Sequence, residues 1–322
     1  MNRYALGIDG GGSKCDAVLL DETGAAVRRG RGGPIHVYYD PPEVITASYV
    51  EAITQALLGT AGADIWVAGP LPEGAPREAV QAANRLARHI PATEVHSAFA
   101  SAQEDWGLIV LAGTGSFVHG RTPDGRHLHC GGLGPILDDY GSAYTIGLLG
   151  LRAAFASDWA PARRTRLAAV IPQALGVADR REIFRLVYVR GIGRRQIAAL
   201  AKVVNAEAEA GDAVSIRCIE AAADELAEIA VDVLRELHMC ELSFPVIPIG
   251  GVARGSRLWW QRICQRLSEV APGMRPVLPR VTPAAGAALV ALKEMGVAWT
   301  PRLLARVAET EEGIEERTRA EG

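Results

Sequence analysis

Three short apolar segments of this chain each run directly into a cluster of glycines. The first, Tyr4–Ile8, is followed by Asp9, three glycines, Ser13 and Lys14, and then by a second β-prone run, Ala17–Leu20. A strand, a tight turn and a second strand form a hairpin, and successive N–H groups in a glycine turn can surround an anion. The alternative is a glycine-rich hairpin without a ligand.

The other two glycine turns lie far along the chain and favour the ligand-binding interpretation. Leu108–Ala112 runs into a Gly-Thr-Gly-Ser turn over residues 113–116. Pro245–Ile249 runs into Gly250 and Gly251, before an arginine-rich helix start. Buried-looking strands that end in glycine turns place backbone N–H groups where a phosphate can approach.

Three strand–glycine turns in this order resemble the layout of the actin-like, sugar-kinase and chaperone ATPase superfamily. Within it, Ala5–Ala291 resembles the BadF/BadG/BcrA/BcrD ATPase family, in its N-acetylglucosamine kinase-like branch. The segment Cys130–Gly147 is similar to the family's CGGWGxxxGDEGSxYWIG block. The resemblance implies a two-lobed α/β fold of the actin-like (ribonuclease H-like) ATPase type, with a nucleotide cleft between the lobes.

The resemblance also implies ATP and Mg²⁺ as ligands. The first two turns would hold the nucleotide phosphates, the third would border the adenosine, and two aspartates would serve Mg²⁺ through water. An N-cap role is the alternative for Asp139. The phosphate-binding residues that the resemblance implies are Gly11, Gly12, Ser13 and Lys14 in the first turn and Gly113, Thr114, Gly115 and Ser116 in the second. Gly250, Gly251 and Arg254 would border the adenosine. Asp9 and Asp139 would serve the metal, Asp139 also taking part in catalysis, and Gly132 and Gly134 would contact the acceptor.

The acceptor elements depart from the family pattern. Kinases of the family take the hydroxyl proton with an aspartate in a turn resembling NDAxxA; aligned with Glu94–Ala102, that position falls on Ser97 and the preceding Asn on His96. Serine cannot act as a base near neutral pH, whereas imidazole titrates in that range, so His96 is the candidate substitute. His36 stands where a GxxN motif has asparagine, and Tyr140 stands where the metal block has glutamate.

These departures leave three hypotheses. The first is a Mg²⁺-dependent ATP phosphotransferase acting on an amino sugar or a related small hydroxyl acceptor. The second is a nucleotide-dependent binding or regulatory module, a pseudo-kinase with weak or no activity. The third, an ATPase that activates a radical enzyme, predicts an iron–sulfur cluster that the five scattered cysteines do not support. We favour the first because altered acceptor residues usually signal a changed acceptor before they signal lost chemistry.

Net charge and the length of the apolar runs limit the classes of partner and the cellular location that we expect. The net charge of −3 gives no general attraction to nucleic acid. No apolar run reaches the ~18 residues that span a membrane. Because the first residues lead into a predicted strand, we expect no signal peptide. We therefore expect a cytoplasmic protein with a small-molecule partner and neither nucleic acid nor membrane, and the resemblance implies a homodimer.

The apolar pattern predicts two lobes of different character. Strands and helices alternate in the first half, whereas residues 141–239 are almost entirely helical in pattern. We expect an N-terminal lobe over residues 1–112 and 283–300, a helix-rich lobe over 113–282, and a charged tail over 301–322. Predicted strands are Tyr4–Asp9, Asp16–Asp21, Ala25–Gly30, Asp64–Ala68, Thr93–His96, Gly107–Ala112 and Pro245–Gly250; predicted helices include Pro42–Leu58, Arg77–His89, Gly211–Leu237 and the small-residue helix Thr282–Met295.

Overall fold

The computed structural model describes residues 2–320, with side chains as far as residue 314. The chain forms two compact units: Met1–Asp105 with Leu278–Gly322, and Trp106–Val277. The strand Gly107–Ala112, expected in the N-terminal lobe, lies in the second unit. Residues 301–320, expected as a charged tail, form a helix of the first unit.

The sheet of the first unit has the strand order β3-β2-β1-β4-β5. β1 (Arg3–Gly10), β2 (Cys15–Asp21) and β3 (Ala26–Gly32) form an antiparallel meander. β4 (Asp64–Ala68) and β5 (Arg85–Ile90) extend it from β1 in parallel. The carboxyl ends of β1, β4 and β5 therefore meet at one edge, which is where open α/β sheets bind ligands.

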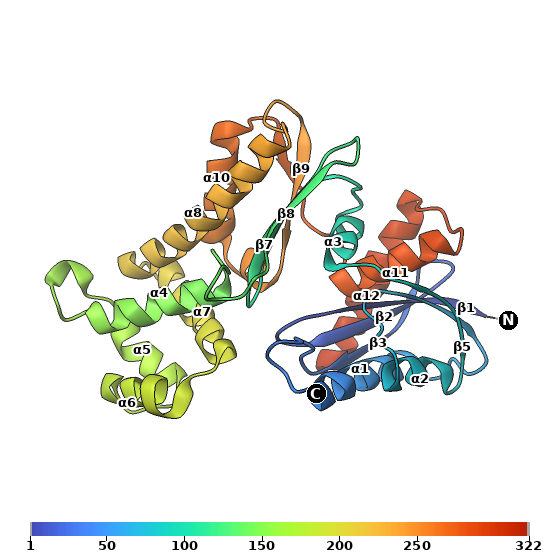
Figure 1. Ribbon diagram of the computed structural model, residues 1–322, viewed down its shortest axis with the longest axis horizontal. Coiled ribbons are helices and arrows are strands. Elements are labelled where there is room, and N and C mark those ends of the chain that lie inside the picture. Colours follow the sequence, from blue (N-terminus) through green and yellow to red (C-terminus); the bar gives the residue numbers. More distant parts are fainter. Residues whose placement is uncertain (1, 321–322) are drawn as a thin grey trace. The chain divides into compact units, whose positions relative to one another are not determined.

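Helices cover both faces of this sheet, because alternate residues of a strand point to opposite sides. Leu6 and Ile8 share a core with α1 (Pro42–Ala56), and Ala5 shares another with α11 (Pro283–Glu294) (Figure 1). The other helices of the unit are α2 (Ala75–Gln81), α3 (Glu94–Ala102) and α12 (Pro301–Ala320).

α11 approaches its neighbours very closely because the residues at the contacts are small. A Cβ on Gly7 would lie 2.0 Å from the carbonyl oxygen of Ala284, and one on Gly286 would lie 2.3 Å from that of Ser97 on α3. Both neighbours are backbone atoms, so no larger side chain fits without moving the chain. The predicted small-residue helix over Thr282–Met295 is confirmed.

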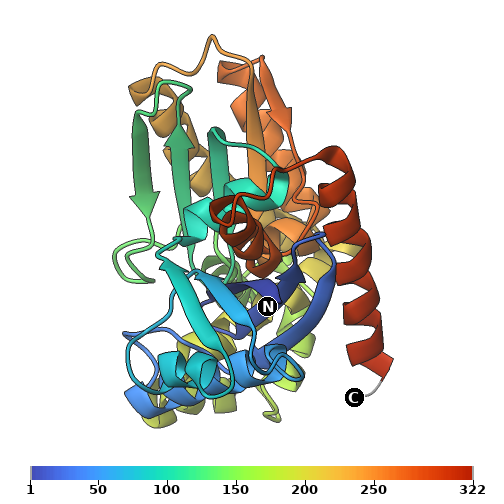
Figure 2. The same ribbon diagram turned by 90° about the vertical axis from the view of Figure 1, so that its right-hand side faces the viewer.

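The sheet of the second unit has the strand order β10-β9-β6-β7-β8. β6 (Gly107–Ala112) and β9 (Phe244–Ile249) are parallel neighbours and are buried along their whole length. β7 (Ser116–Arg121) and β8 (His127–Gly131) continue the sheet in the antiparallel sense, and β10 (Met274–Pro276) borders β9. Figure 2 shows these strands side by side, coloured from green to orange.

The longest helix of the second unit, α8 (Ala213–Glu236), follows the predicted helix Gly211–Leu237 closely. Its residues Ile219, Leu226 and Val233 recur every seven positions and are all buried, as one face of a core helix requires. Within the described chain, no helix combines the length and apolar character that a membrane crossing needs. The remaining helical segments are α4 (Ala143–Ala156), η1 (Pro161–Arg163), α5 (Leu167–Ala174), α6 (Arg180–Arg185), η2 (Leu186–Gly191), α7 (Arg194–Glu209), α9 (Gly251–Gly255) and α10 (Arg257–Val270).

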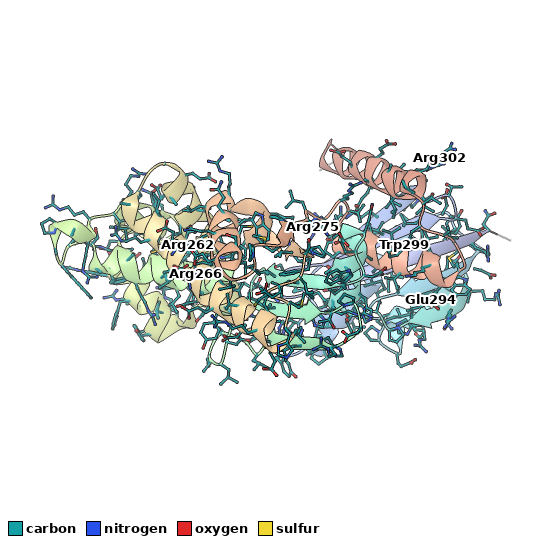
Figure 3. The ribbon with its side chains drawn as sticks, turned by 90° about the horizontal axis from the view of Figure 1, so that it is seen from above. Arg262, Arg266, Arg275, Glu294, Trp299 and Arg302 are labelled. Carbon is teal, nitrogen blue, oxygen red and sulfur yellow. The ribbon has the colours of Figure 1, made fainter. Side chains whose placement is uncertain are left out.

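An ion-pair network joins α8 to α10. The Arg262 guanidinium donates to both carboxylate oxygens of Asp224 on α8, over 2.7 and 2.9 Å. Arg266, one turn further along α10, lies 3.6 Å from the same carboxylate. Figure 3 shows the two arginines on neighbouring turns of the helix. The pairs fix the long helix of the unit against α10.

Two predictions of secondary structure are wrong. Thr93–His96, expected as a strand, forms the N-cap and first turn of α3. The helix expected over Arg77–His89 ends with α2 at Gln81, and the following residues form β5, paired with β4. In both cases a short mixed segment takes its conformation from its sheet and helix neighbours instead of its local pattern.

Candidate functional site

The predicted hairpin at the start of the chain is confirmed. β1 and β2 pair antiparallel and leave residues 11–14 as the loop. The Gly11 N–H donates to the Lys14 carbonyl over 3.0 Å, and the Gly11 carbonyl accepts from the Ile35 N–H over 3.0 Å. A Cβ on Gly11 would meet nothing within 4 Å. The open space beside this backbone is a cradle that fits a phosphate group.

Positive charge gathers beside the loop around one buried carboxylate. Asp16, only 4% exposed, accepts hydrogen bonds from Lys14 and Arg31 and pairs with Arg29 at 3.1 Å. Burial alone would raise the pKa of Asp16, but Arg29, Lys14 and Arg31 outweigh it and hold the pKa below its usual range. Lys14, Arg29 and Arg31 thus place basic side chains beside the first glycine loop.

A cavity of about 330 Å³ opens at the carboxyl ends of the parallel strands of the first unit. Asp9 lies at the end of β1, Gly69 directly follows β4, and His89 lies near the end of β5. A Cβ on Gly69 would lie 2.1 Å from the carbonyl oxygen of Ile8, so the turn after β4 requires glycine. The lining consists of Ile8, Asp9, Gly10, Gly69, Pro70, His89, Pro91, Ala92, Thr93, Glu94 and Ser97.

Glu94, the first residue of α3, contributes a carboxyl group to this cavity. Its side chain reaches solvent, yet the surrounding protein displaces much of the water. This desolvation, with the charge of Asp9, raises the pKa of Glu94 to about 7. A carboxylate with such a pKa is suited to accept a proton near neutral pH. Sequence analysis missed Glu94 because it placed a strand here; a threonine before an acidic first turn was the helix-start signal.

His96, the substitute base suggested by the sequence, has a structural partner instead. Its Nδ1 accepts from the Thr93 N–H over 3.2 Å and lies 2.8 Å from the Thr93 hydroxyl, in a capping-box arrangement at the start of α3. The cavity lining includes Ser97 but not His96. The Ser97 hydroxyl donates to the Thr93 carbonyl over 3.3 Å. The first turn of α3 therefore brings Glu94 and Ser97 to the cavity.

His36 lies in a tight loop that Ile35 attaches to the first hairpin. The His36 N–H donates to Oδ2 of Asp40 over 3.0 Å, and the Asp40 N–H donates to the His36 carbonyl over 2.9 Å. The ring centroids of His36 and Tyr39 are 4.6 Å apart, and Tyr38 is 86% exposed. The loop thus presents an exposed aromatic cluster on the segment that follows β3.

The second glycine turn, between β6 and β7, contacts the third. The Gly113 N–H donates to the Gly115 carbonyl over 2.8 Å. Gly250 has a φ of 98°, and a Cβ there would lie 2.3 Å from the Ala112 carbonyl oxygen and 3.0 Å from the Gly113 nitrogen. Only glycine permits this approach, so the structure brings these two predicted turns together within the second unit.

The third turn opens onto the start of α9. A Cβ on Gly251, the first residue of α9, would meet nothing within 4 Å. Arg254, on the same short helix, is exposed, and its N–H donates to the Gly250 carbonyl over 3.3 Å. An accessible backbone and an exposed guanidinium are compatible with the predicted place beside a nucleoside.

Asp139 lies beside the second turn and is 1% exposed. Its carboxylate accepts from the Arg194 guanidinium over 2.6 Å and from the Ser116 N–H over 3.3 Å. A Cβ on Gly115 would lie 2.4 Å from Oδ1 of Asp139. The N-cap of α4 is Ser142, so the N-cap alternative for Asp139 does not hold. The aspartate and its arginine set the shape of the turn.

The predicted acceptor glycines lie in the loop between β8 and Asp139. Gly132 and Gly134 have φ values of 80° and 87°, in the left-handed region that favours glycine. The Gly132 N–H donates to the Ser116 carbonyl over 2.9 Å, and the Asp138 N–H donates to the Gly134 carbonyl over 2.8 Å. This loop is therefore attached to the second glycine turn.

The candidate metal ligands are the two aspartates beside the glycine turns. Among the residues that the structure describes, no group of three His, Cys, Asp or Glu side chains is arranged to hold an ion. Mg²⁺ in nucleotide sites takes one or two carboxylates, with waters and phosphates completing its shell. Asp9 and Asp139, each beside a glycine turn, fit that pattern.

Comparison with known proteins identifies the family. Residues 6–291 match the model of the BadF/BadG/BcrA/BcrD ATPase family. The match covers most of the chain, so the chain belongs to this family, as the glycine turns and the block around Asp139 implied.

Several relatives are sugar kinases. An N-acetylmuramic acid/N-acetylglucosamine kinase from Clostridium acetobutylicum is 27% identical over 307 residues, which cover 91% of this chain and 99% of that protein. An N-acetyl-D-glucosamine kinase from Dictyostelium discoideum is 24% identical, with 89% and 97% covered. The structure of a candidate N-acetylglucosamine kinase from Chromobacterium violaceum has a TM-score of 0.64 at 23% identity, with 90% of this chain and 99% of that chain covered. The predicted fold, two α/β lobes of the actin-like ATPase and sugar-kinase type, is confirmed.

Proposed function

We propose that this member of an ATPase family is a Mg²⁺-dependent kinase that transfers the terminal phosphoryl group of ATP to a hydroxyl group of an amino sugar. The observation that carries the proposal is the cavity at the carboxyl ends of the parallel strands, which Glu94 lines together with Asp9 and Ser97. The raised pKa of Glu94, about 7, supports the role of proton acceptor. The relatives that are kinases of N-acetylmuramic acid or N-acetylglucosamine support the acceptor class.

In this proposal the first hairpin binds the phosphates. The backbone of residues 11–13 lies against the β- and γ-phosphates, and the basic side chains that pair with Asp16 attract their charge. Lys14, the last residue of the loop, pairs with Asp16 and in this proposal exchanges that partner for a phosphate oxygen. Mg²⁺, when bound, would neutralise further charge on the transferred group.

Glu94 acts as the general base. Its ionised carboxylate accepts the proton of the acceptor hydroxyl while the hydroxyl oxygen bonds to the γ-phosphorus and the bond to ADP breaks. Aligning Glu94 with the Asp of NDAxxA also aligns the last alanine of that motif with Ala98. The usual aspartate is then replaced by glutamate, and Ser97 is left to hydrogen-bond the acceptor.

The second unit contributes nucleotide contacts in this proposal. The turn of residues 113–116 meets the phosphates, and Gly250, Gly251 and Arg254 border the adenosine. Asp139 serves Mg²⁺ through water, since Arg194 and the Ser116 N–H already occupy its carboxylate. Gly132 and Gly134 keep the acceptor loop against the second turn.

A nucleotide-dependent regulatory module is the second candidate. The observation that favours it is the buried Asp139–Arg194 pair, which competes with a metal for the carboxylate. Such a protein would bind ATP, and no acceptor would speed its turnover.

ADP release distinguishes the two candidates. The protein is incubated with Mg²⁺-ATP alone and with N-acetylglucosamine, N-acetylmuramic acid, glucosamine or glucose. We expect an amino sugar to stimulate ADP release and to yield a sugar phosphate in equal amount. Saturable ATP binding with no stimulation by any acceptor would favour the regulatory module.

A further inference from the structure

A second cavity, of about 200 Å³, lies in the second unit. Its walls come from α4, η1 and α8, and none of the residues that we assign to ATP or Mg²⁺ lines it. Leu149 and Ala153 of α4 face Val214 and Cys218 of α8 across it. The space exists because alanines occupy positions where a larger side chain would fill the groove between the helices.

The floor of the cavity is apolar. Burial raises the pKa of Cys218 to about 11, although the charge of Arg217 opposes this shift. The thiol is therefore neutral near pH 7 and behaves as a small apolar group. With Leu149, Val214 and the alanines, it offers a surface that favours a hydrocarbon chain over water.

Two arginines give the cavity a positive rim. Arg163 and Arg217 both line it and are exposed, and in the described chain neither forms an ion pair. The Arg163 guanidinium lies over the ring of Trp159, 5.8 Å from the centroid, which restricts it to this side. Asp212, the buried N-cap of α8, accepts from N–H groups of that helix and from the Thr165 hydroxyl. Its charge is thus already compensated.

We propose that this cavity binds a small amphipathic anion, a carboxylate with an unbranched apolar tail. The carboxylate lies between Arg163 and Arg217, whose planar guanidinium groups match its geometry. The tail lies on Leu149, Val214 and Cys218. The cavity volume has room for about six carbon groups, each taking ~30 Å³. This volume fits a chain of about six carbons.

Isothermal titration of the full-length protein with hexanoate tests the proposal. We expect one saturable site, with affinity weakened roughly tenfold or more by Arg217→Ala and by Arg163→Ala. Acetate, which lacks the tail, and hexanol, which lacks the charge, should each bind at least about tenfold more weakly. Arg152→Ala removes an exposed arginine of α4 outside the cavity and should leave binding unchanged.

A variant that fills the cavity gives an independent check. Ala221 lines the cavity from the exposed side of α8, so Ala221→Phe should abolish hexanoate binding without unfolding the protein. The absence of saturable binding, equal binding to Arg217→Ala, or equal affinity for hexanol would each overturn the proposal. Because none of these residues belongs to the proposed kinase site, the result is independent of kinase activity.

Discussion

The candidate sites of the two units are built in opposite ways. In the first unit, Gly11 faces open space and Glu94 lines a cavity of about 330 Å³. In the second, Gly115 is packed against Asp139, which Arg194 holds in a buried ion pair at 2.6 Å. An open site leaves room for a reacting group, whereas a turn packed on an ion pair keeps one shape. Substitutions in the first site should therefore change chemistry, and substitutions in the second should change folding and ATP affinity.

The largest expected effect is on turnover. Glu94→Gln keeps the size of the side chain and removes the proton acceptor, so kcat should fall roughly 10²–10⁴-fold while the Kd for ATP stays the same. Steady-state ADP release and ATP titration measure the two quantities. Glu78→Gln, at an exposed glutamate in the first turn of α2, is the matched control.

The pH profile of the same reaction assigns the base. Only the ionised form accepts a proton, so activity should fall as the pH drops through the pKa of Glu94, raised to about 7 by burial and by Asp9. Asp9 and His89 line the same cavity, so the limb of the profile is assigned by substitution. The acidic limb of the pH–activity profile belongs to Glu94 if it is absent from the profile of Glu94→Gln. An acidic limb that is the same in the variant and the native protein would refute the assignment.

The next effect separates the two glycine turns. A Cβ at residue 115 would lie 2.4 Å from Oδ1 of Asp139, so Gly115→Val should disrupt the Asp139–Arg194 pair and lower the free energy of unfolding by about 3–5 kcal/mol. Gly11→Ala meets open space and should weaken ATP binding without lowering stability. Denaturant unfolding and ATP titration of both variants test this. Equal stability losses would remove the contrast between the units.

A smaller loss is expected at Asp16, the buried anion of the first unit. Asp16→Asn removes the buried carboxylate charge that pairs with the Arg29 guanidinium, whose side chain is 6% exposed, and should cost about 1–3 kcal/mol. The folded-state pKa of Asp16 is lowered, so its contribution is present above the usual carboxyl pKa and is lost as the pH falls through the folded value. The difference in Tm between the variant and the native protein should therefore shrink in acid. Asp105→Asn, at an 82% exposed side chain, is the control.

The smallest effect is expected at His96. His96→Ala removes one half of the capping interaction of α3 and should cost about 0.5–1 kcal/mol, with kcat changed by no more than a few-fold. Thermal unfolding and ADP release measure both. A fall in kcat as large as that of Glu94→Gln would return His96 to the position of general base.

The glycine turns were predictable because their cause is local. A strand followed by several glycines has few conformations besides a tight turn, and the hairpin of β1 and β2 formed as expected. The close approach of Gly250 to Ala112 follows from the parallel pairing of β6 and β9, which no local pattern encodes.

The cavity of the first unit was not predictable in the same way. It requires β5 to lie beside β4, yet Arg85–Ile90 was predicted as part of a helix. It also requires α3 to begin at Glu94, whereas Thr93–His96 was predicted as a strand, with the catalytic position aligned to Ser97. The short segments that build the cavity take their conformation from partners distant in sequence.

The close packing of α11 also has a consequence for the order in which the protein can be made. Gly7 of the first strand and the carbonyl oxygen of Ser97 on α3 lie against α11, which follows the whole second unit in the sequence. A ribosome must therefore synthesise the whole second unit before the first can complete its core. Until that helix emerges, α3 lacks the packing partner that lies against its Ser97 carbonyl and Ser101.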